Sequence, residues 1–538
     1  MSRPGALPRG AVIAGLGVAV CLAGPTTAEE LHVPGRFGTI QAAVDAARDG
    51  DEVIVAAGEY TEATDLRGKR ITLRSSGGAA ATILDGASLT RSILVADSGE
   101  SRATVVQGFT FRHGRGTFAD ACRVRGNHGG AIFVRDGGIT VLDSVFVGTT
   151  TQVPEGNAPI SAGGAISACE ADLVVARSRF EGNGANFGGA IRFAASVSRQ
   201  ASIAGSAFVG NYSGHGGAIL GELDGRASIE VTHCAFLENQ ASHGGSLRVV
   251  AAEESRASVR DSSFADGAGA FGGAANLTAD PGDIEVVRCD FVDNEAGFGG
   301  ALFLTAWGGP QGSAGGRIRV TAARIVGNVA HPCCDAGLYQ DGCFRDDPAP
   351  NGPELLYGGG AGAHASSCAG GVVELVNCTL VDNEPYGIHF RLGTSDHPDE
   401  PGLGAFQVAN SIVRGGTGPE EILVEIPAPG PTVAVTHSNV EHGAAGAGNI
   451  DAPVAFRGAA AGDYRLAPGA AGIDAGDNGA IDPTIDVDLD GGSRFVDDPV
   501  TGDTGAGAAP VVDIGADEYR PSLRRPRRVV RDRVGPTP

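Results

Sequence analysis

Five polar residues recur at matching positions of a repeated sequence and could act together on a sugar chain. His233, Asp261 and Arg288 each stand three residues before an aromatic residue, and Glu230 and Glu285 occupy a neighbouring position. If successive repeats stack about 4.8 Å apart, Glu230 and Glu285 lie about 10 Å apart, near the upper edge of the carboxylate separation in inverting glycosidases. The simpler interpretation is an exposed charge ladder worth about 1 kcal/mol or less. We therefore expect no catalytic residue here.

A second column of the repeat carries rings directly before a Gly-Gly pair. Its members are Phe187, His215, His243, Phe271 and Phe298. Stacked rings would stabilise a corner of the repeat, and they could also form a binding platform for sugars.

A third pattern predicts a cation site near the C-terminal end. Asp486, Asp488 and Asp490 alternate ahead of Gly491, and Asp497 takes the twelfth position of a calcium-binding loop. Alternating carboxylates followed by glycine can wrap oxygen ligands around Ca²⁺. Against calcium, the closing residue is Asp rather than Glu, and aspartates also fix turns by accepting backbone hydrogen bonds. We keep Ca²⁺ as the predicted cofactor and the metal-free turn as its alternative.

The cysteines divide into two kinds by their position in the repeat. Cys234 and Cys289 share one column two repeats apart, about 10 Å, which is too far for a disulfide, so we expect buried thiols. A cysteine-rich insertion at 329–358 interrupts the repeat and favours disulfides, with a zinc site that includes His331 and Asp335 as the alternative. The disulfide candidates are Cys122, Cys169, Cys333, Cys334, Cys343 and Cys368.

A repeat of about 28 residues must position all these groups. Gly-Gly-small-apolar motifs begin at Gly188, Gly216, Gly244, Gly272 and Gly299, in steps of 28, 28, 28 and 27 residues. Each motif follows a Phe-x-x-Asn-like motif, and the apolar residues alternate with period two, which indicates strands. The prediction is an all-β, single-stranded, right-handed parallel β-helix with three short strands per coil, an N-terminal helical cap and an irregular C-terminal region.

This fold gives a prediction that coordinates can test directly. Residues from about 33 to 440 should form one unbroken stack of coils. Ile191, Ile219, Leu247 and Leu302 should then share one interior column, and the asparagines should share amide hydrogen bonds from coil to coil.

Three resemblances extend this interpretation. Gly-Gly-Ala-Ile with Phe-x-x-Asn, over about 127–383, resembles the repeats of polymorphic outer-membrane proteins, which implies a bacterial surface β-helix. The opening Thr39–Ala47, followed by Gly50-Asp51-Glu52, resembles the entry of pectin-lyase-like β-helices. Motifs such as Gly472-Ile473-Asp474-Ala475-Gly476 resemble the choice-of-anchor Q segment of exported bacterial proteins. We expect no counterpart of the first family's C-terminal membrane barrel in this sequence.

The N-terminal sequence and the net charge indicate in which compartment the protein acts and which partners it does not bind. Residues 1–28 have the basic, apolar and small-residue zones of a signal peptide, with lipidation at Cys21 as an alternative. The net charge of −23 argues against nucleic acid, and no second stretch is apolar enough to span a membrane. The predicted divisions are 1–28 signal peptide, 29–92 N-terminal cap and first coils, 93–404 repeats, 405–519 anchor-like segment and 520–538 basic disordered tail.

The predicted function is therefore that of a secreted or cell-surface β-helix protein. Its role would be non-catalytic, in adhesion or carbohydrate recognition, with an extracellular glycan or a cell-surface partner. The alternatives are a polysaccharide lyase or glycoside hydrolase acting on an extracellular glycan, and a passive structural component of the envelope. Because no complete catalytic motif occurs on the repeats, we expect no turnover of polygalacturonate or similar acidic glycans.

Overall fold

A computed structural model describes residues 28–151, 160–308, 315–331, 360, 362–367, 370–392, 404–425 and 432–521. Residues 1–27 of the predicted signal peptide, which include Cys21, lie outside these described residues, and so do Asp335 and the four cysteines of the insertion region. Nearly all of the predicted basic tail lies outside them as well.

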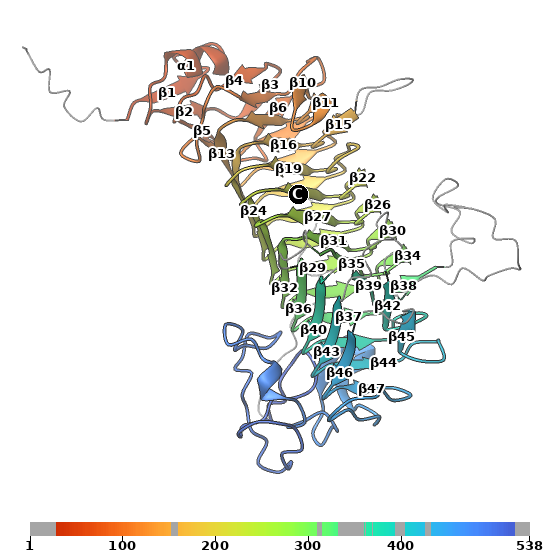
Figure 1. The fold of residues 1–538 in the computed structure, drawn as a ribbon. Coiled ribbons are helices and arrows are strands. Elements are labelled where there is room, and N and C mark those ends of the chain that lie inside the picture. The colour runs from red at the N-terminus through yellow and green to blue at the C-terminus, as the bar shows by residue number, and fades with distance from the viewer. Residues whose placement is uncertain are drawn as a thin grey trace, which may run out of the picture.

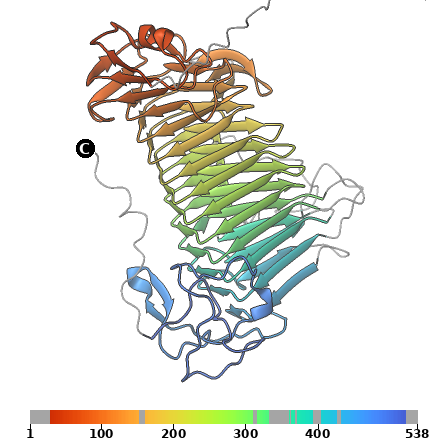
Figure 2. The ribbon, with the colours of Figure 1, turned by 90° about the vertical axis from the view of Figure 1, so that its left-hand side faces the viewer.

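The chain forms a long stack of coils, with the N-terminal residues at one end and the C-terminal segment beside the other (Figures 1 and 2). Each full coil contributes one strand to each of three parallel sheets, here named A, B and C in the order in which the chain visits them. The parallel β-helix prediction is confirmed.

Sheet A contains β1 (Glu30–Val33), β2 (Glu52–Val55), β5 (Thr72–Ser75), β8 (Val105–Gln107), β13 (Gly138–Leu142), β17 (Asp172–Ala176), β20 (Gln200–Ala204), β24 (Ser228–Thr232), β28 (Arg256–Arg260), β32 (Asp283–Val287), β36 (Arg317–Thr321), β40 (Val372–Val376), β43 (Ala405–Ala409) and β46 (Thr432–Thr436). Sheet B contains β3 (Gly58–Tyr60), β6 (Thr82–Asp85), β9 (Thr110–Arg112), β14 (Val145–Val147), β18 (Arg179–Glu181), β21 (Ala207–Val209), β25 (Ala235–Leu237), β29 (Ser263–Ala265), β33 (Asp290–Val292), β37 (Arg324–Val326), β41 (Thr379–Val381), β44 (Ile412–Arg414) and β47 (Asn439–Val440). Sheet C contains β4 (Thr64–Asp65), β7 (Leu94–Ala96), β12 (Ile132–Arg135), β16 (Ile166–Cys169), β19 (Ile191–Ala195), β23 (Ile219–Leu223), β27 (Leu247–Ala252), β31 (Ala275–Asp280), β35 (Leu302–Ala306), β39 (Ala363–Ser367), β42 (Ile388–Leu392) and β45 (Ile422–Glu425).

The repeat predicted three strands per coil, but several coils have a fourth. Sheet D contains β22 (Tyr212–His215), β26 (Gln240–His243), β30 (Ala268–Phe271), β34 (Glu295–Phe298) and β38 (Val329–Ala330). These short strands lie between sheets B and C, just before the Gly-Gly corner. The first glycine of each pair has positive φ there, and a Cβ on Gly244 would lie 2.2 Å from the Leu247 carbonyl oxygen, so this position excludes larger residues.

Stacked side chains fill the interior in register, as the repeat predicted. Ile191, Ile219, Leu247 and Leu302 occupy one buried column, with Ala275 between the last two. The Phe residues of sheet B also stack, with ring centroids 4.5 to 5.0 Å apart from coil to coil. The interior of the stack is therefore one continuous apolar core.

The asparagine column forms the predicted ladder. Asn183 donates through Nδ2 to Oδ1 of Asn211 at 2.9 Å, and Asn211 donates in the same way to Asn239 at 2.9 Å. A second run joins Asn294 to Asn328. Each amide also reaches a backbone carbonyl of the preceding coil, so these buried polar groups are satisfied.

The first coil carries the single α-helix of the described residues. Helix α1 (Ile40–Ala46) begins after Thr39, whose hydroxyl accepts a hydrogen bond from the Ala42 N–H. Ile40, Ala43 and Val44 are buried in the core, and the helix contacts β1, β2 and β4.

In the coil that begins with β8, an antiparallel hairpin lies beside sheet C. It consists of β10 (Thr117–Ala121) and β11 (Val124–His128), and β15 (Ile160–Ala162) continues it in parallel. Cys122 and Cys169, two of the disulfide candidates, form a disulfide that ties this hairpin to β16. Cys234 and Cys289 are buried free thiols, as expected.

The C-terminal segment packs on the outside of the stack. The coils continue to Val440, so the boundary predicted at 405 falls inside the stack. Beyond it lie the short strands β48 (Phe456–Gly458) and β49 (Asp463–Leu466), and the 3₁₀ turns η1 (Ala459–Ala461) and η2 (Asn478–Ala480). A second apolar cluster joins this segment to the outer face of sheet B through side chains such as Ile412, Ile473 and Ile514.

Candidate functional site

The outer face of sheet A carries a charged groove of about 440 Å³. Its lining residues are Ser228, Ile229, Glu230, Arg256, Ala257, Ser258, Asp283, Ile284, Glu285, Arg317, Arg319 and Asp482. Strands β24, β28, β32 and β36 form its floor, and the C-terminal segment contributes one residue, Asp482. Charged side chains of both signs therefore dominate the lining, and it contains no aromatic ring.

Strand register places the acidic residues of this groove. Side chains alternate between the core and the outside along each strand, so one outward column passes through Glu230, Ser258, Glu285, Arg319 and Glu374 on successive coils. Glu230 and Glu285 are two coils apart, as the sequence predicted. Their backbones are thus about 10 Å apart by the strand spacing.

Ion pairs hold one end of the groove. The buried Glu374 carboxylate accepts hydrogen bonds from Nε of Arg317 and Nε of Arg319, both at 2.8 Å. Arg319 also pairs with Asp482. Hydrogen bonds from the backbone and hydroxyl of Thr484, together with the nearby Arg319, hold the pKa of Asp482 below its usual value. Glu374 therefore holds both arginines in the lining, and Asp482 also pairs with Arg319.

At the other end of the groove, the charged side chains are more exposed and have fewer partners. Within the described part of the chain, Glu230 is exposed and has no hydrogen bond or ion pair. Arg256 and Asp283 are both largely exposed, and Nε of Arg256 lies 3.9 Å from Oδ2 of Asp283. Glu285 is paired with Arg260. A ligand at this end would meet side chains that can still form hydrogen bonds.

The structure separates the predicted cluster into two groups. Glu230 and Glu285 line the groove, but His233, Asp261 and Arg288 lie in the turns between sheets A and B, where each has positive φ. Arg288 donates to both oxygens of Asp261, at 2.9 and 2.7 Å. Asp261 and Arg288 thus form an ion pair, and they and His233 lie outside the groove lining.

Sequence reasoning missed the arginines and Asp482. Arg317 and Arg319 alternate on a strand, a signal that could have placed them on the outer face with Glu285. Asp482 follows no repeat, and only the docking of the C-terminal segment brings it to sheet A.

The predicted ring column forms one continuous stack. Centroid distances are 5.2 Å for Phe187–His215, 4.7 Å for His215–His243, 5.0 Å for His243–Phe271 and 5.6 Å for Phe271–Phe298. Because the faces of neighbouring rings cover one another, this geometry supports the corner-stabilising interpretation rather than a sugar platform. Burial and the charge of Arg248 lower the pKa of both histidines to about 4.

The four residues of the predicted calcium loop do not converge on one point. Buried Asp488 accepts hydrogen bonds from the backbone N–H groups of Gly492 and Glu518 and pairs with Arg520. Asp490 lies 3.6 Å from Arg465. The run is thus used as a turn, because backbone amides and arginines occupy the carboxylates that a cation would need. Asp497 instead lies near Asp474 and Asp503.

A second hollow of about 410 Å³ lies on the outside of sheet C, beside the disulfide-linked hairpin. Phe187, Arg192, Glu222 and Asp224 are among its lining residues. The guanidinium of buried Arg192 donates to Glu222 and to the Cys122 carbonyl.

Comparison with known proteins gives only distant likenesses. No protein-family model matches the chain, and no curated protein sequence matches it. A mutant of the PL6 family alginate lyase AlyGC is similar, with 14% identity and a TM-score of 0.47, over 92% of this chain and 59% of the lyase. A GH87 alpha-1,3-glucanase catalytic domain has 11% identity and a TM-score of 0.40, over 76% of this chain and 68% of that domain. The chain thus spans less than two thirds of AlyGC, and likenesses this distant carry no argument about activity.

Among the described residues, no helix is both long and apolar enough to cross a membrane.

Proposed function

We propose that this chain is an exported β-helix protein that binds a hydroxyl-rich, uncharged extracellular glycan in the groove of sheet A. The observation that carries the proposal is the groove itself, which has a volume of about 440 Å³ and is lined by both arginines and carboxylates. Carboxylates accept and guanidinium groups donate hydrogen bonds, so neighbouring sugar hydroxyls find both kinds of partner.

Charge favours an uncharged glycan over a polyuronate. The lining contains Arg256, Arg317 and Arg319 against four carboxylates, Glu230, Asp283, Glu285 and Asp482. Carboxylates of a polyuronate would meet this excess of negative charge, as well as the overall charge of −23. An uncharged chain would not be repelled.

Glycoside hydrolysis in the same groove is a second candidate function. It is favoured by Glu230 and Glu285, two carboxylates on one outward column of the lining. An inverting hydrolase needs one carboxylic acid and one carboxylate on opposite sides of the scissile bond, about 6.5–9.5 Å apart. Rotation of side chains on backbones about 10 Å apart can reach this range.

Binding to a panel of soluble glycans tests the proposal. We expect a neutral polysaccharide to bind, polyuronates to bind at least about tenfold more weakly, and Glu230→Gln to weaken binding of the neutral glycan by a similar factor. Glu181→Gln, on the outer face of sheet B, is the matched control and should bind like the parent. Preference for polyuronates, or equal loss in both variants, would contradict the proposal.

Release of reducing ends from any bound glycan separates the two functions. A hydrolase would show turnover that disappears in both Glu230→Gln and Glu285→Gln, whereas a binding protein would release none.

A further inference from the structure

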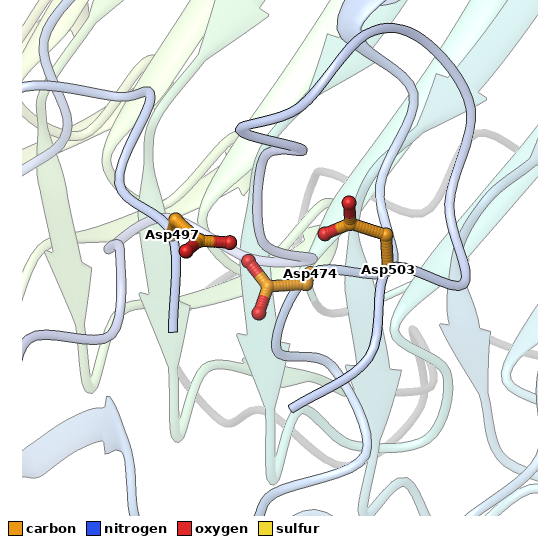
Figure 3. Close-up of side chains that lie close together, drawn as sticks. All are labelled: Asp474, Asp497 and Asp503. Carbon is orange, nitrogen blue, oxygen red and sulfur yellow. The ribbon is translucent and has the colours of Figure 1, made fainter. Parts of the chain in front are cut away.

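We propose that Asp474, Asp497 and Asp503 bind a calcium ion that fastens the C-terminal segment. The three carboxylates offer ligand oxygens that all lie within 4.8 Å of one another. Calcium binds oxygens at 2.3–2.6 Å, so oxygens around one ion lie no more than about 5 Å apart. Figure 3 shows the carboxylate of Asp474 between those of Asp497 and Asp503.

The buried member of the cluster, Asp474, has one carboxylate oxygen without a hydrogen bond to the described residues. Asp474 is fully buried, and within the part of the chain that the structure describes its Oδ1 atom has no hydrogen-bond partner. Its Oδ2 atom accepts only a long hydrogen bond, 3.4 Å, from the Asp498 N–H. An unpaired buried carboxylate oxygen is costly unless a cation or a proton compensates it. A cation held between the three carboxylates would supply that compensation.

Both ends of the loop from Asp498 to Thr504 are hydrogen-bonded to Asp474. The Asp474 carbonyl accepts hydrogen bonds from the N–H groups of Thr504 and Gly505, at 2.9 and 3.1 Å. At the other end, the Asp498 N–H points to the Asp474 carboxylate. Asp503 lies on the loop between Asp498 and Thr504, and Asp497 directly precedes Asp498. The backbone therefore places two exposed carboxylates beside a buried one before any ion arrives.

Electrostatics supports a cation at this point. The three carboxylates are close enough to repel one another when ionised, and a cation held between them would offset that repulsion. Three oxygen ligands on an open loop suit calcium, which accepts flexible geometry and completes its shell with water, better than magnesium. This site differs from the Asp486–Asp490 run, whose buried Asp488 is engaged by amides and Arg520.

Calcium titration by calorimetry, together with thermal unfolding in calcium and in chelator, tests the proposal on the full chain. We expect the parent to bind Ca²⁺ and to unfold at a higher temperature in its presence. Asp497→Asn and Asp503→Asn should each weaken Ca²⁺ binding at least about tenfold. In chelator both variants should unfold at or above the parent's temperature, because each removes a repelling charge. Carboxylates with a merely structural role would instead give variants that melt lower in both conditions.

Asp486→Asn is the matched control, since Asp486 is an exposed carboxylate of the same segment outside the cluster. We expect this control to bind Ca²⁺ like the parent, and Mg²⁺ to bind the parent more weakly than Ca²⁺. The proposal is overturned if the parent binds no Ca²⁺ at millimolar concentration. It is also overturned if the two cluster variants bind like the parent, or if the control loses binding as they do.

Discussion

The coil stack and the C-terminal segment are stabilised in opposite ways. In the stack, each side chain lies on an equivalent side chain of the next coil, as in the phenylalanine column, where Phe236 and Phe264 lie 4.5 Å apart. The segment from 441 to 521 has no repeated contacts and instead contains buried ion pairs that occur once each. Arg494 is fully buried, pairs with Glu518 at 3.1 Å and donates to the Gly515 carbonyl. Repetition spreads stability over many equal contacts, whereas the segment depends on a few.

Replacing the buried arginine of the C-terminal segment, Arg494, should have the largest effect on stability. Arg494→Met leaves the buried Glu518 carboxylate without its partner, which costs about 3–5 kcal/mol. We expect amide hydrogen exchange to accelerate between 441 and 521 while the coils keep their protection. Arg226→Met, which breaks an exposed pair with Glu254, should change neither region. Equal acceleration in the coils would mean that the two regions unfold as one unit.

A smaller loss should follow when one asparagine leaves the ladder. Asn239→Ala removes the acceptor of the Asn211 N–H and side-chain amide, and such unsatisfied buried groups cost about 1–3 kcal/mol each. We expect the urea midpoint of the stack to fall. Gln240→Ala is the control. Gln240 directly follows Asn239 and its side chain is exposed, so this substitution should leave the urea midpoint nearly unchanged. Similar losses in both variants would show that the ladder adds nothing specific.

The two regions should also respond to pH in opposite directions. In the ring column, burial and Arg248 lower the pKa of His215 and His243 to about 4. Between pH 6.5 and 4 the unfolded chain takes up protons that the folded stack does not, so the stack loses stability as pH falls through this window. Calorimetric unfolding across it should show the decline, and His243→Phe should reduce it.

In the C-terminal segment, burial, followed by the charges of Asp490 and Asp488, raises the pKa of Asp517 to about 7, against the opposing charges of Arg324 and Arg494. The folded segment therefore holds a proton that the unfolded chain loses above pH 4. Its stability is greatest at low pH and is lost as pH rises towards 7. Asp517→Asn should flatten this dependence. Parallel pH profiles for the two regions would contradict the comparison.

Much of the coil stack could be predicted from the sequence because its contacts repeat. A side chain in one coil meets the residue about 28 positions later, so the interior column of Ile191, Ile219 and Leu247 follows from spacing alone. The same reasoning placed Glu230 and Glu285 on one outward column. It could not show the fourth strand of sheet D, because that strand has no alternating apolar pattern of its own.

Only the tertiary structure decided where the C-terminal residues act. Asp482 reaches Arg319 across 163 positions, and Asp474 meets Asp497 and Asp503 through a loop without any repeat. The Asp-x-Asp-x-Asp-Gly pattern predicted a calcium loop, yet Asp488 faces Arg520 instead. Local spacing determines which residues a short loop can bring together, but which charges become buried depends on the surface where the segment docks. Here that surface is the outer face of sheet B, where the Thr379 hydroxyl of β41 accepts a hydrogen bond from the Ala516 N–H.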